Sequence, residues 1–383
     1  MKKIILFLIA GVMALTGCDE EKEGCKTLPA QFDASTTLSG CYNAPVSPVI
    51  TDGVTITMEP GTQITFAQDT GLDFAGTASL VAVGTAAKPI LLTGAQKQRG
   101  AWIGVHFDAA TSSANRMDYV TVEYAGSTTA ENDPDAAAVK LTSDSSPVRL
   151  SLSHCTLRES QGWGLWVEGG TELPTFAANT LTANTLGAVN LDSALVQLLD
   201  DASSYAGNTQ DRVLVRANQV GQNVTWPALD APYYLEGSLM VESVWTLSPG
   251  TTMIMGPAAQ ITIAGDEAAM NAVGTTEEPI VITGHEATAG AWDAIVFDTT
   301  NNASNVLEYV TLEYGGGGEE QYDLAMIVAV SDSAGVTIDV ANCILRDSLK
   351  YAIYLDSYAS YNADIESGNT FSDNASGDVI LVD

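Results

Sequence analysis

A long internal duplication is the feature of this sequence that most restricts its fold. The chain reads GTAAKPILLTG, GAWIGVHFD and MDYVTVEYAG from Gly84 onward, and GTTEEPIVITG, GAWDAIVFD and LEYVTLEYGG from Gly274 onward. The offset is 190 residues, the difference between positions 274 and 84. Matches on both sides, such as CTLRES with CILRDS and NTLTAN with NTFSDN, lengthen the unit. A repeat at a fixed offset indicates a fold that stacks similar structural units.

The duplicated unit consists of short strand-like runs such as VTITM, ILLTG and YVTVEY, separated by Gly, Asn, Asp, Ser or Pro. A coil of two or three short strands cannot bury its apolar face alone and must stack on its neighbours. The sequence therefore predicts an all-β, single-stranded parallel β-helix. We expect it to be right-handed, because parallel crossovers nearly always are. About thirteen coils at roughly 4.8 Å each would form a rod about 60 Å long.

The first residues resemble an export signal. Lys2 and Lys3 precede an apolar stretch, residues 4–15, that is too short for a stable membrane span. The following LTGC, ending at Cys18, resembles the lipobox of bacterial lipoproteins and implies a lipid on Cys18 and removal of residues 1–17. An ordinary signal peptide with a chance cysteine is the alternative. Several acyl chains on Cys18 would anchor the protein durably in the bacterial cell envelope, with the outer membrane or cell surface favoured over the inner membrane.

The rest of the chain divides into four segments. Residues 18–27 are charged and predict a flexible acidic tether, and residues 28–48 predict an N-terminal cap. Residues 49–238 hold the first repeat unit and residues 239–383 the second.

Four cysteines follow the lipobox. Cys25 and Cys41 flank the tether and the cap, and an exported chain permits a disulfide between them. Cys155 and Cys343 occupy matched positions in the two copies and are expected to be buried and unpaired. His154 precedes Cys155, but neighbouring residues on a strand point to opposite faces, which argues against a nucleophile pair. The three histidines are scattered and do not suit a zinc site.

Strand alternation separates core positions from surface positions in the paired WIGVHF and WDAIVF segments. The residues expected to face the core are Val105, Phe107, Ile295 and Phe297. Trp102 and Trp292 allow two interpretations: they fill the interior, or they stand outside as platforms that stack on sugars and bind them. The interior is favoured, because Gly104 or Ala294 leaves room for a large ring.

From residue 46 to the end, WIGVHF, DYVTVEYAG, the EPGT corner and GTAAKPI resemble the right-handed parallel β-helix proteins of the pectin-lyase-like class, and more narrowly bacterial lipoproteins built from those repeats. Residues 205–241 resemble a bridge between units that recurs in such proteins, and this resemblance implies one continuous rod over two separate domains. The resemblance implies carbohydrate-active relatives, which are lyases or hydrolases with a groove along one face. It also implies calcium held by acidic residues and a basic residue that abstracts a proton. The candidate catalytic residues are Arg158, Glu159, Arg346 and Asp347. Because they occur in both copies, we expect them to be structural.

The charge balance restricts the partners. The chain has 47 acidic and 15 basic residues and a formal charge of -32. Such a rod repels nucleic acid and anionic polymers. Carboxylates at loop positions suit calcium, and the candidate metal ligands are Asp108, Asp133, Asp135 and Asp298. Solubility is the simpler explanation of the acidity and is favoured over specific calcium sites.

Together these observations predict a noncatalytic, monomeric, lipid-anchored surface rod that presents loops to a glycan or protein partner. The alternative is a polysaccharide lyase or hydrolase on the same scaffold. An enzyme should show one groove of convergent Asp, Arg or Lys side chains, uneven along the rod. A binding rod should instead gather its longest loops, residues 127–135 and 315–322, on one side.

Overall fold

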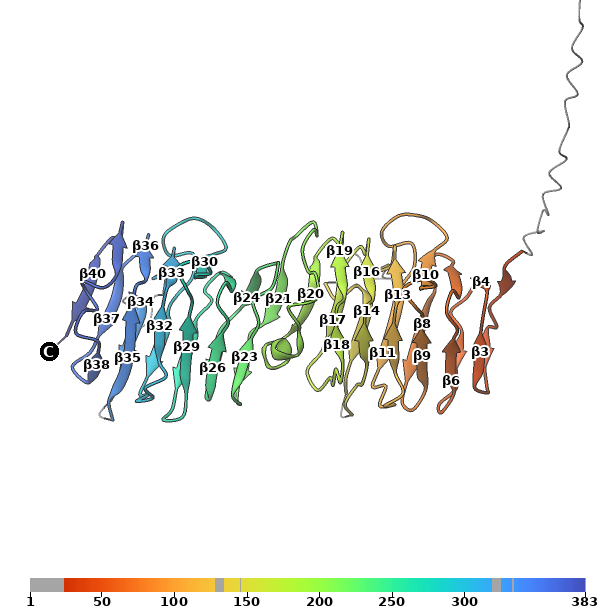
Figure 1. Cartoon of the computed structure of the whole chain (residues 1–383), viewed down its shortest axis with the longest axis horizontal. Helices are drawn as coiled ribbons and strands as arrows, with labels where there is room; N and C mark the ends of the chain where they lie inside the picture. The colour runs from red at the N-terminus through yellow and green to blue at the C-terminus, as the bar shows by residue number, and fades with distance from the viewer. Residues whose placement is uncertain (1–23, 128–133, 145, 319–324, 333, 383) are drawn as a thin grey trace, which may run out of the picture.

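The computed structural model describes residues 24–127, 134–144, 146–318, 325–332 and 334–382, and these form one β-solenoid. The strands lie side by side along the long axis of a rod, with β3 and β4 near one end and the C-terminus at the other (Figure 1). Every pair of neighbouring strands is parallel. The predicted parallel β-helix is confirmed.

One twelve-stranded sheet, called here the long sheet, runs through both halves of the rod. Its strands are β8 (Gly71–Ala75), β11 (Gly104–Asp108), β14 (Ala137–Thr142), β17 (Trp163–Val167), β20 (Gly187–Asp192), β21 (Val213–Arg216), β24 (Tyr233–Glu236), β27 (Thr252–Met255), β30 (Ile280–Gly284), β33 (Val310–Glu313), β36 (Ile344–Arg346) and β39 (Thr370–Ser372). Its twelve strands agree with the expected count of about thirteen coils, since earlier coils place β2 (Gln31–Phe32) and β5 (Val49–Ile50) in a separate small sheet.

Two further sheets complete the first half. The seven-stranded one contains β1 (Lys26–Thr27), β4 (Cys41–Ala44), β7 (Gln63–Phe66), β10 (Ile90–Gly94), β13 (Val120–Glu123), β16 (Thr156–Arg158) and β19 (Thr180–Thr182). The six-stranded one contains β3 (Thr36–Leu38), β6 (Thr55–Met58), β9 (Ser79–Val83), β12 (Arg116–Asp118), β15 (Ser151–Ser153) and β18 (Phe176–Ala177). From β7 to β18, each coil passes from the seven-stranded sheet to the long sheet and then to the six-stranded sheet.

The second half has its own pair of sheets. The seven-stranded one contains β22 (Gln219–Val220), β25 (Leu239–Val241), β28 (Ile261–Ala264), β31 (Ile295–Asp298), β34 (Ala325–Val330), β37 (Tyr351–Leu355) and β40 (Gly377–Leu381). The six-stranded one contains β23 (Val224–Trp226), β26 (Val244–Leu247), β29 (Ala269–Val273), β32 (Val306–Glu308), β35 (Val336–Ala341) and β38 (Ala359–Tyr361).

The two copies are out of phase by one face of the rod. The corresponding strands β7 and β27 lie in different sheets, the first in the seven-stranded sheet and the second in the long sheet. Likewise β11 belongs to the long sheet, but its counterpart β31 does not. The change occurs at the junction, where the 3-10 helix η1 (Ser193–Leu198) packs against β20 to β23. Duplicated sequence therefore does not produce a duplicated surface on the long sheet.

The interior is apolar along the whole rod. Val105 is 1% exposed, and Phe107, Ile295 and Phe297 are fully buried, which confirms the predicted core positions. The matched Pro-Gly corners also behave as expected: Gly61 has φ +85° and Gly250 has φ +82°, values that glycine adopts at little cost.

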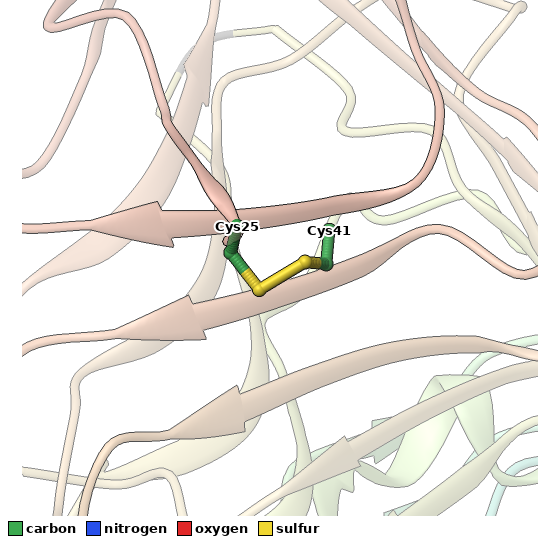
Figure 2. The surroundings of a disulfide bond; sticks show 2 residues. All are labelled: Cys25 and Cys41. Atoms are coloured by element: carbon green, nitrogen blue, oxygen red, sulfur yellow. A yellow bond between two sulfur atoms is a disulfide. The ribbon is translucent and has the colours of Figure 1, made fainter. Parts of the chain in front are cut away.

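The fold begins earlier than the expected tether boundary at residue 27. Cys25 and Cys41 form a disulfide (Figure 2), and Lys26 and Thr27 form β1, which pairs with β4. The segment expected to be a cap contributes β2, β3 and β4, which pair in register with later coils. Cys18 and the proposed signal peptide lie outside the described residues. Within the described part of the chain, no helix is long and apolar enough to cross a membrane.

Asparagine side chains explain the NTLTAN and NTFSDN repeats. Asn184 accepts a hydrogen bond from the Ser160 amide at 3.0 Å and donates one to the Leu157 carbonyl at 3.1 Å, both on the preceding coil. In the second copy, Asn374 binds the Ser348 amide and the Leu345 carbonyl in the same way. These buried amides tie each turn to the coil before it.

Candidate functional site

Trp102 and Trp292 are not surface platforms. Both indoles are fully buried, and each donates its Nε1 hydrogen bond to a backbone carbonyl, Glu123 O at 2.8 Å and Glu313 O at 2.9 Å. Phe66 stacks on Trp102 with ring centroids 4.2 Å apart. The binding role considered for these residues is therefore wrong, because a ring with no exposed face cannot stack on a sugar.

Arg158 does not form a catalytic pair with its sequence neighbour Glu159. Its guanidinium binds Glu123, at 2.6 Å from Nη2 and 3.1 Å from Nε, while Glu159 binds Arg99 at 3.0 Å. Glu123 is 5% exposed, and Lys97 lies 3.3 Å from its other oxygen. Burial favours the neutral acid, but the hydrogen bonds from Arg158 and others hold the pKa of Glu123 below its ordinary value.

The second copy repeats this arrangement in a simpler form. Arg346 binds Glu313, at 2.8 Å from Nε and 2.5 Å from Nη2. Asp347 lies 3.9 Å from the same guanidinium and is the weaker contact. The side chains of Arg158 and Arg346 are thus occupied as inter-coil ties, consistent with the structural role expected from their duplication.

The structure does not bring together the proposed calcium ligands that it describes, Asp108, Asp135 and Asp298. The exposed Asp108, at the end of β11 in the long sheet, accepts a hydrogen bond from Thr142 at 2.9 Å. Asp298, at the end of β31 in a different sheet, accepts one from Thr299 at 2.9 Å. Asp135 lies in the turn before β14, and Asp133 lies outside the described residues. No group of three or more His, Cys, Asp or Glu side chains in the described ranges could hold a metal ion.

Cys155 and Cys343 are buried free thiols, as expected. Burial raises the pKa of each to about 12, so neither thiol is ionised near neutral pH. His154 binds Asp118 at 3.0 Å and not Cys155. The His154-Cys155 pair is therefore not a nucleophile.

The structure shows a cluster of aromatic and apolar side chains on the outer face of the long sheet, which the sequence analysis did not predict. Leu214 lies between Val213 and Val215, which face the core, and so it points outward. It packs with Trp163 and Trp166, which are 2% and 7% exposed, in a cluster separate from the main core. We call this set the outer-face cluster; its other members are Ala137, Leu186 and Tyr234.

Cations cover the aromatic rings of the outer-face cluster. Lys140 lies 5.0 Å from the centroid of the Trp166 ring and Arg216 lies 4.7 Å from it. Arg216 also binds Asp192 at 2.8 Å and donates to Asn190 Oδ1. Arg216 is therefore fixed by partners on its own surface and contributes to packing more than to ligand capture.

Arg212 is held differently. Its guanidinium lies 5.3 Å from the centroid of Trp163 and 4.8 Å from that of Tyr234, and its Nε donates to the Leu186 carbonyl at 3.3 Å. The other arginines each form an ion pair with a carboxylate. Arg212 has no such partner among the described residues. Burial lowers its pKa, because the charge is partly removed from water, and the nearby Tyr234 and Glu236 offset this only in part.

A pocket of about 420 Å³ opens beside Arg212. We call it the Arg212 pocket; the polar side chains in its wall are Gln161, Thr185, Asn190, Arg212 and Glu236, and its apolar part includes Ala136, Trp163, Leu186 and Leu214. Asn190 is 6% exposed, and its Nδ2 has no hydrogen-bond partner in the described part of the chain. An amide donor with no partner in the described residues, beside a guanidinium with no ion pair there, suits a ligand with several oxygen atoms.

The second copy does not repeat this site. Tyr351 and Tyr354 stand where the first copy has Trp163 and Trp166, and they pack beside an apolar surface on another sheet. Val328 takes the position of Lys140. In the part of the chain that the structure describes, the Arg212 pocket therefore occurs once, near the middle of the rod (Figure 1).

Sequence reasoning did not find this site, because simple alternation places residues three apart on opposite faces of a strand. Here Gly164 and Leu165 both face the interior, so Trp163 and Trp166 share the outer face. The available signal was composition: Arg212 and Arg216 flank one strand in the bridge, a segment outside the clearest repeats.

Comparison with known proteins does not extend these observations. The chain matches no protein-family model, no curated protein and no solved structure.

Proposed function

We propose that this protein is a noncatalytic, lipid-anchored β-solenoid of the bacterial cell envelope, similar to the pectin-lyase-like class, which binds a glycan on the outer face of its long sheet. The observation that carries the proposal is Arg212, a guanidinium stacked on aromatic rings beside a pocket, with no ion pair within the described residues. Such a group is costly to retain in a folded protein unless a ligand uses it. The binding element is thus a sheet face, in place of the loops expected from the sequence.

Glycan binding is supported by the character of the pocket wall. Amide, guanidinium and carboxylate groups line the pocket together with apolar side chains, and sugars carry both hydroxyls and apolar C–H faces. A glycan array probed with protein lacking residues 1–17 tests the proposal. We expect binding that is lost in Arg212→Gln and kept in Arg116→Gln, which changes an exposed arginine on another sheet. Binding of no glycan, or equal loss in both variants, would contradict it.

A polysaccharide lyase or hydrolase is the second candidate, favoured by the uneven placement of the Arg212 pocket along the rod. Hydrolysis needs two carboxylates, and Glu236 is the carboxylate in the described pocket wall. Incubation with acidic and neutral polysaccharides, followed by assays for unsaturated and reducing ends, separates the candidates. We expect no turnover; turnover abolished by Arg212→Ala would establish the enzyme.

The lipid anchor is testable independently of the pocket. We expect the chain expressed in a bacterium to be cleaved before Cys18 and to carry diacylglycerol there, as seen by mass spectrometry of the N-terminal peptide. Cys18→Ser should leave the protein unlipidated and released from membranes by mild extraction. An unmodified Cys18 in the membrane-bound wild type would contradict anchoring by this residue.

A further inference from the structure

We infer that Arg212 binds the carboxylate of a single uronic-acid residue carried by an otherwise neutral glycan. This inference rests on the proposed glycan-binding function and names the chemical class of the ligand at the same site. It follows from the geometry of Arg212, from the polar wall around it and from the negative charge of the rod.

The guanidinium is oriented to receive a planar anion. Trp163 and Tyr234 contact it, and the Leu186 carbonyl takes its Nε hydrogen. Both terminal nitrogens remain without a hydrogen-bond partner among the described residues. Two parallel N–H groups match the two oxygens of a carboxylate, and an orientation fixed in advance reduces the entropy lost on binding.

The pocket wall suits a sugar ring attached to that carboxylate. Gln161 presents an amide beside Arg212, and Asn190 Nδ2 lacks an acceptor within the described ranges. The Thr185 hydroxyl is already engaged, because it donates to the Ser160 carbonyl and accepts from Arg99. A volume of about 420 Å³ lies near the lower end of small-molecule sites and admits a unit of monosaccharide size. A ligand with one carboxylate and several hydroxyls would satisfy Arg212, Gln161 and Asn190.

The surrounding charge selects against more than one negative group. Glu236 is exposed in the same wall, and the chain carries a formal charge of -32. A polyuronate would bring a row of carboxylates against this field, and a phosphate ester would bring two charges to one arginine. A single carboxylate forms an ion pair with Arg212 and adds only one negative charge beside Glu236.

Titration by ligand-observed NMR and tryptophan fluorescence tests this selectivity with protein lacking residues 1–17. The probes are the methyl uronides of glucose, galactose and mannose, each beside its neutral methyl glycoside, together with glucose 6-phosphate and polygalacturonate. We expect one uronide to bind about tenfold or more tightly than its neutral partner, since hydrogen bonds to a charged group contribute more than neutral ones. Added salt should weaken the uronide selectively.

Substitutions show which side chain causes the preference for the uronide. Arg212→Gln should remove the preference for the uronide, Arg212→Lys should keep only part of it, and Arg116→Gln should not change it. Glu236→Gln should improve binding of polygalacturonate more than that of the uronide. Equal binding of neutral and acidic sugars, or a preference that survives Arg212→Gln, would overturn the inference and leave glycan binding intact. If none of the sugars binds, the proposed function fails as well.

Discussion

The guanidinium of Arg158 binds the carboxylate of Glu123 on the preceding coil, 2.6 Å away, and leaves the adjacent Glu159 to Arg99. Contacts across coils therefore take precedence over contacts along the sequence. In a solenoid, residues on neighbouring coils lie about 4.8 Å apart, and two consecutive residues on a strand point in opposite directions. The same relationship holds for Arg346 and Glu313 in the second copy.

The first prediction concerns the pH dependence of this tie. The folded-state pKa of Glu123 is lowered, so its contribution to stability is present above the unfolded value of about 4.3 and disappears as the pH falls through the lower folded value. We expect Glu123→Gln to reduce the free energy of unfolding by about 1–3 kcal/mol at pH 7, with a smaller difference near pH 3. Urea denaturation across this range measures it. Glu159→Gln is the control, because its pair with Arg99 is partly exposed and should cost less than about 1 kcal/mol.

The second prediction concerns the disulfide. Cys25 and Cys41 are separated by 16 residues and join the segment before β1 to β4. A loop of this length corresponds to about 3 kcal/mol of stabilisation in the chain-entropy description. We expect reduction, or Cys25→Ser, to speed hydrogen exchange at Lys26, Thr27 and the facing residues of β4. Exchange in the second repeat should not change, because each coil contacts only its neighbours. Equal acceleration along the whole rod would contradict local capping by this bond.

The third prediction concerns the buried indoles. Trp102→Ala and Trp292→Ala should each lower the free energy of unfolding by about 3–5 kcal/mol, because each leaves a large cavity and an unpaired carbonyl. Ile103→Ala, a neighbouring exposed side chain, should cost no more than about 0.5 kcal/mol. Sugar affinity measured on variants that remain folded should be unchanged. Loss of affinity without loss of stability would restore the surface-platform interpretation.

The fourth prediction concerns calcium. Asp108 and Asp298 lie on separate sheets and are bound to threonine hydroxyls. We therefore expect the melting temperature to be the same in calcium and in EDTA when the ionic strength is matched. Magnesium at equal ionic strength is the control for general screening of the acidic surface. A rise of several degrees in calcium alone would require a specific site.

The architecture could be predicted from the sequence because its causes are local. Alternation placed Val105 and Phe107 in the core, and the Pro-Gly corner set the turn at Gly61. The Arg212 pocket could not be predicted, because two non-local facts create it. The copies are shifted by one face, and the alternation of β17 is interrupted at Gly164. The aligned sequences of the two copies look alike with or without the shift and the interruption, so neither could be recognised from the sequence.

The last prediction concerns the asparagine ties, which account for a repeat that the sequence shows without explaining. Asn184→Ala removes both the acceptor for the Ser160 amide and the donor to the Leu157 carbonyl, and these groups are too buried to reach water easily. We expect a loss of about 2–4 kcal/mol and faster hydrogen exchange of the Ser160 amide. Asn184→Asp keeps the acceptor and should protect that amide better than alanine does. Asn218→Ala, at an exposed position, should have no measurable effect. If Ser160 exchanges at the wild-type rate in Asn184→Ala, the side chain does not tie the two coils, and the NTLTAN repeat needs another cause.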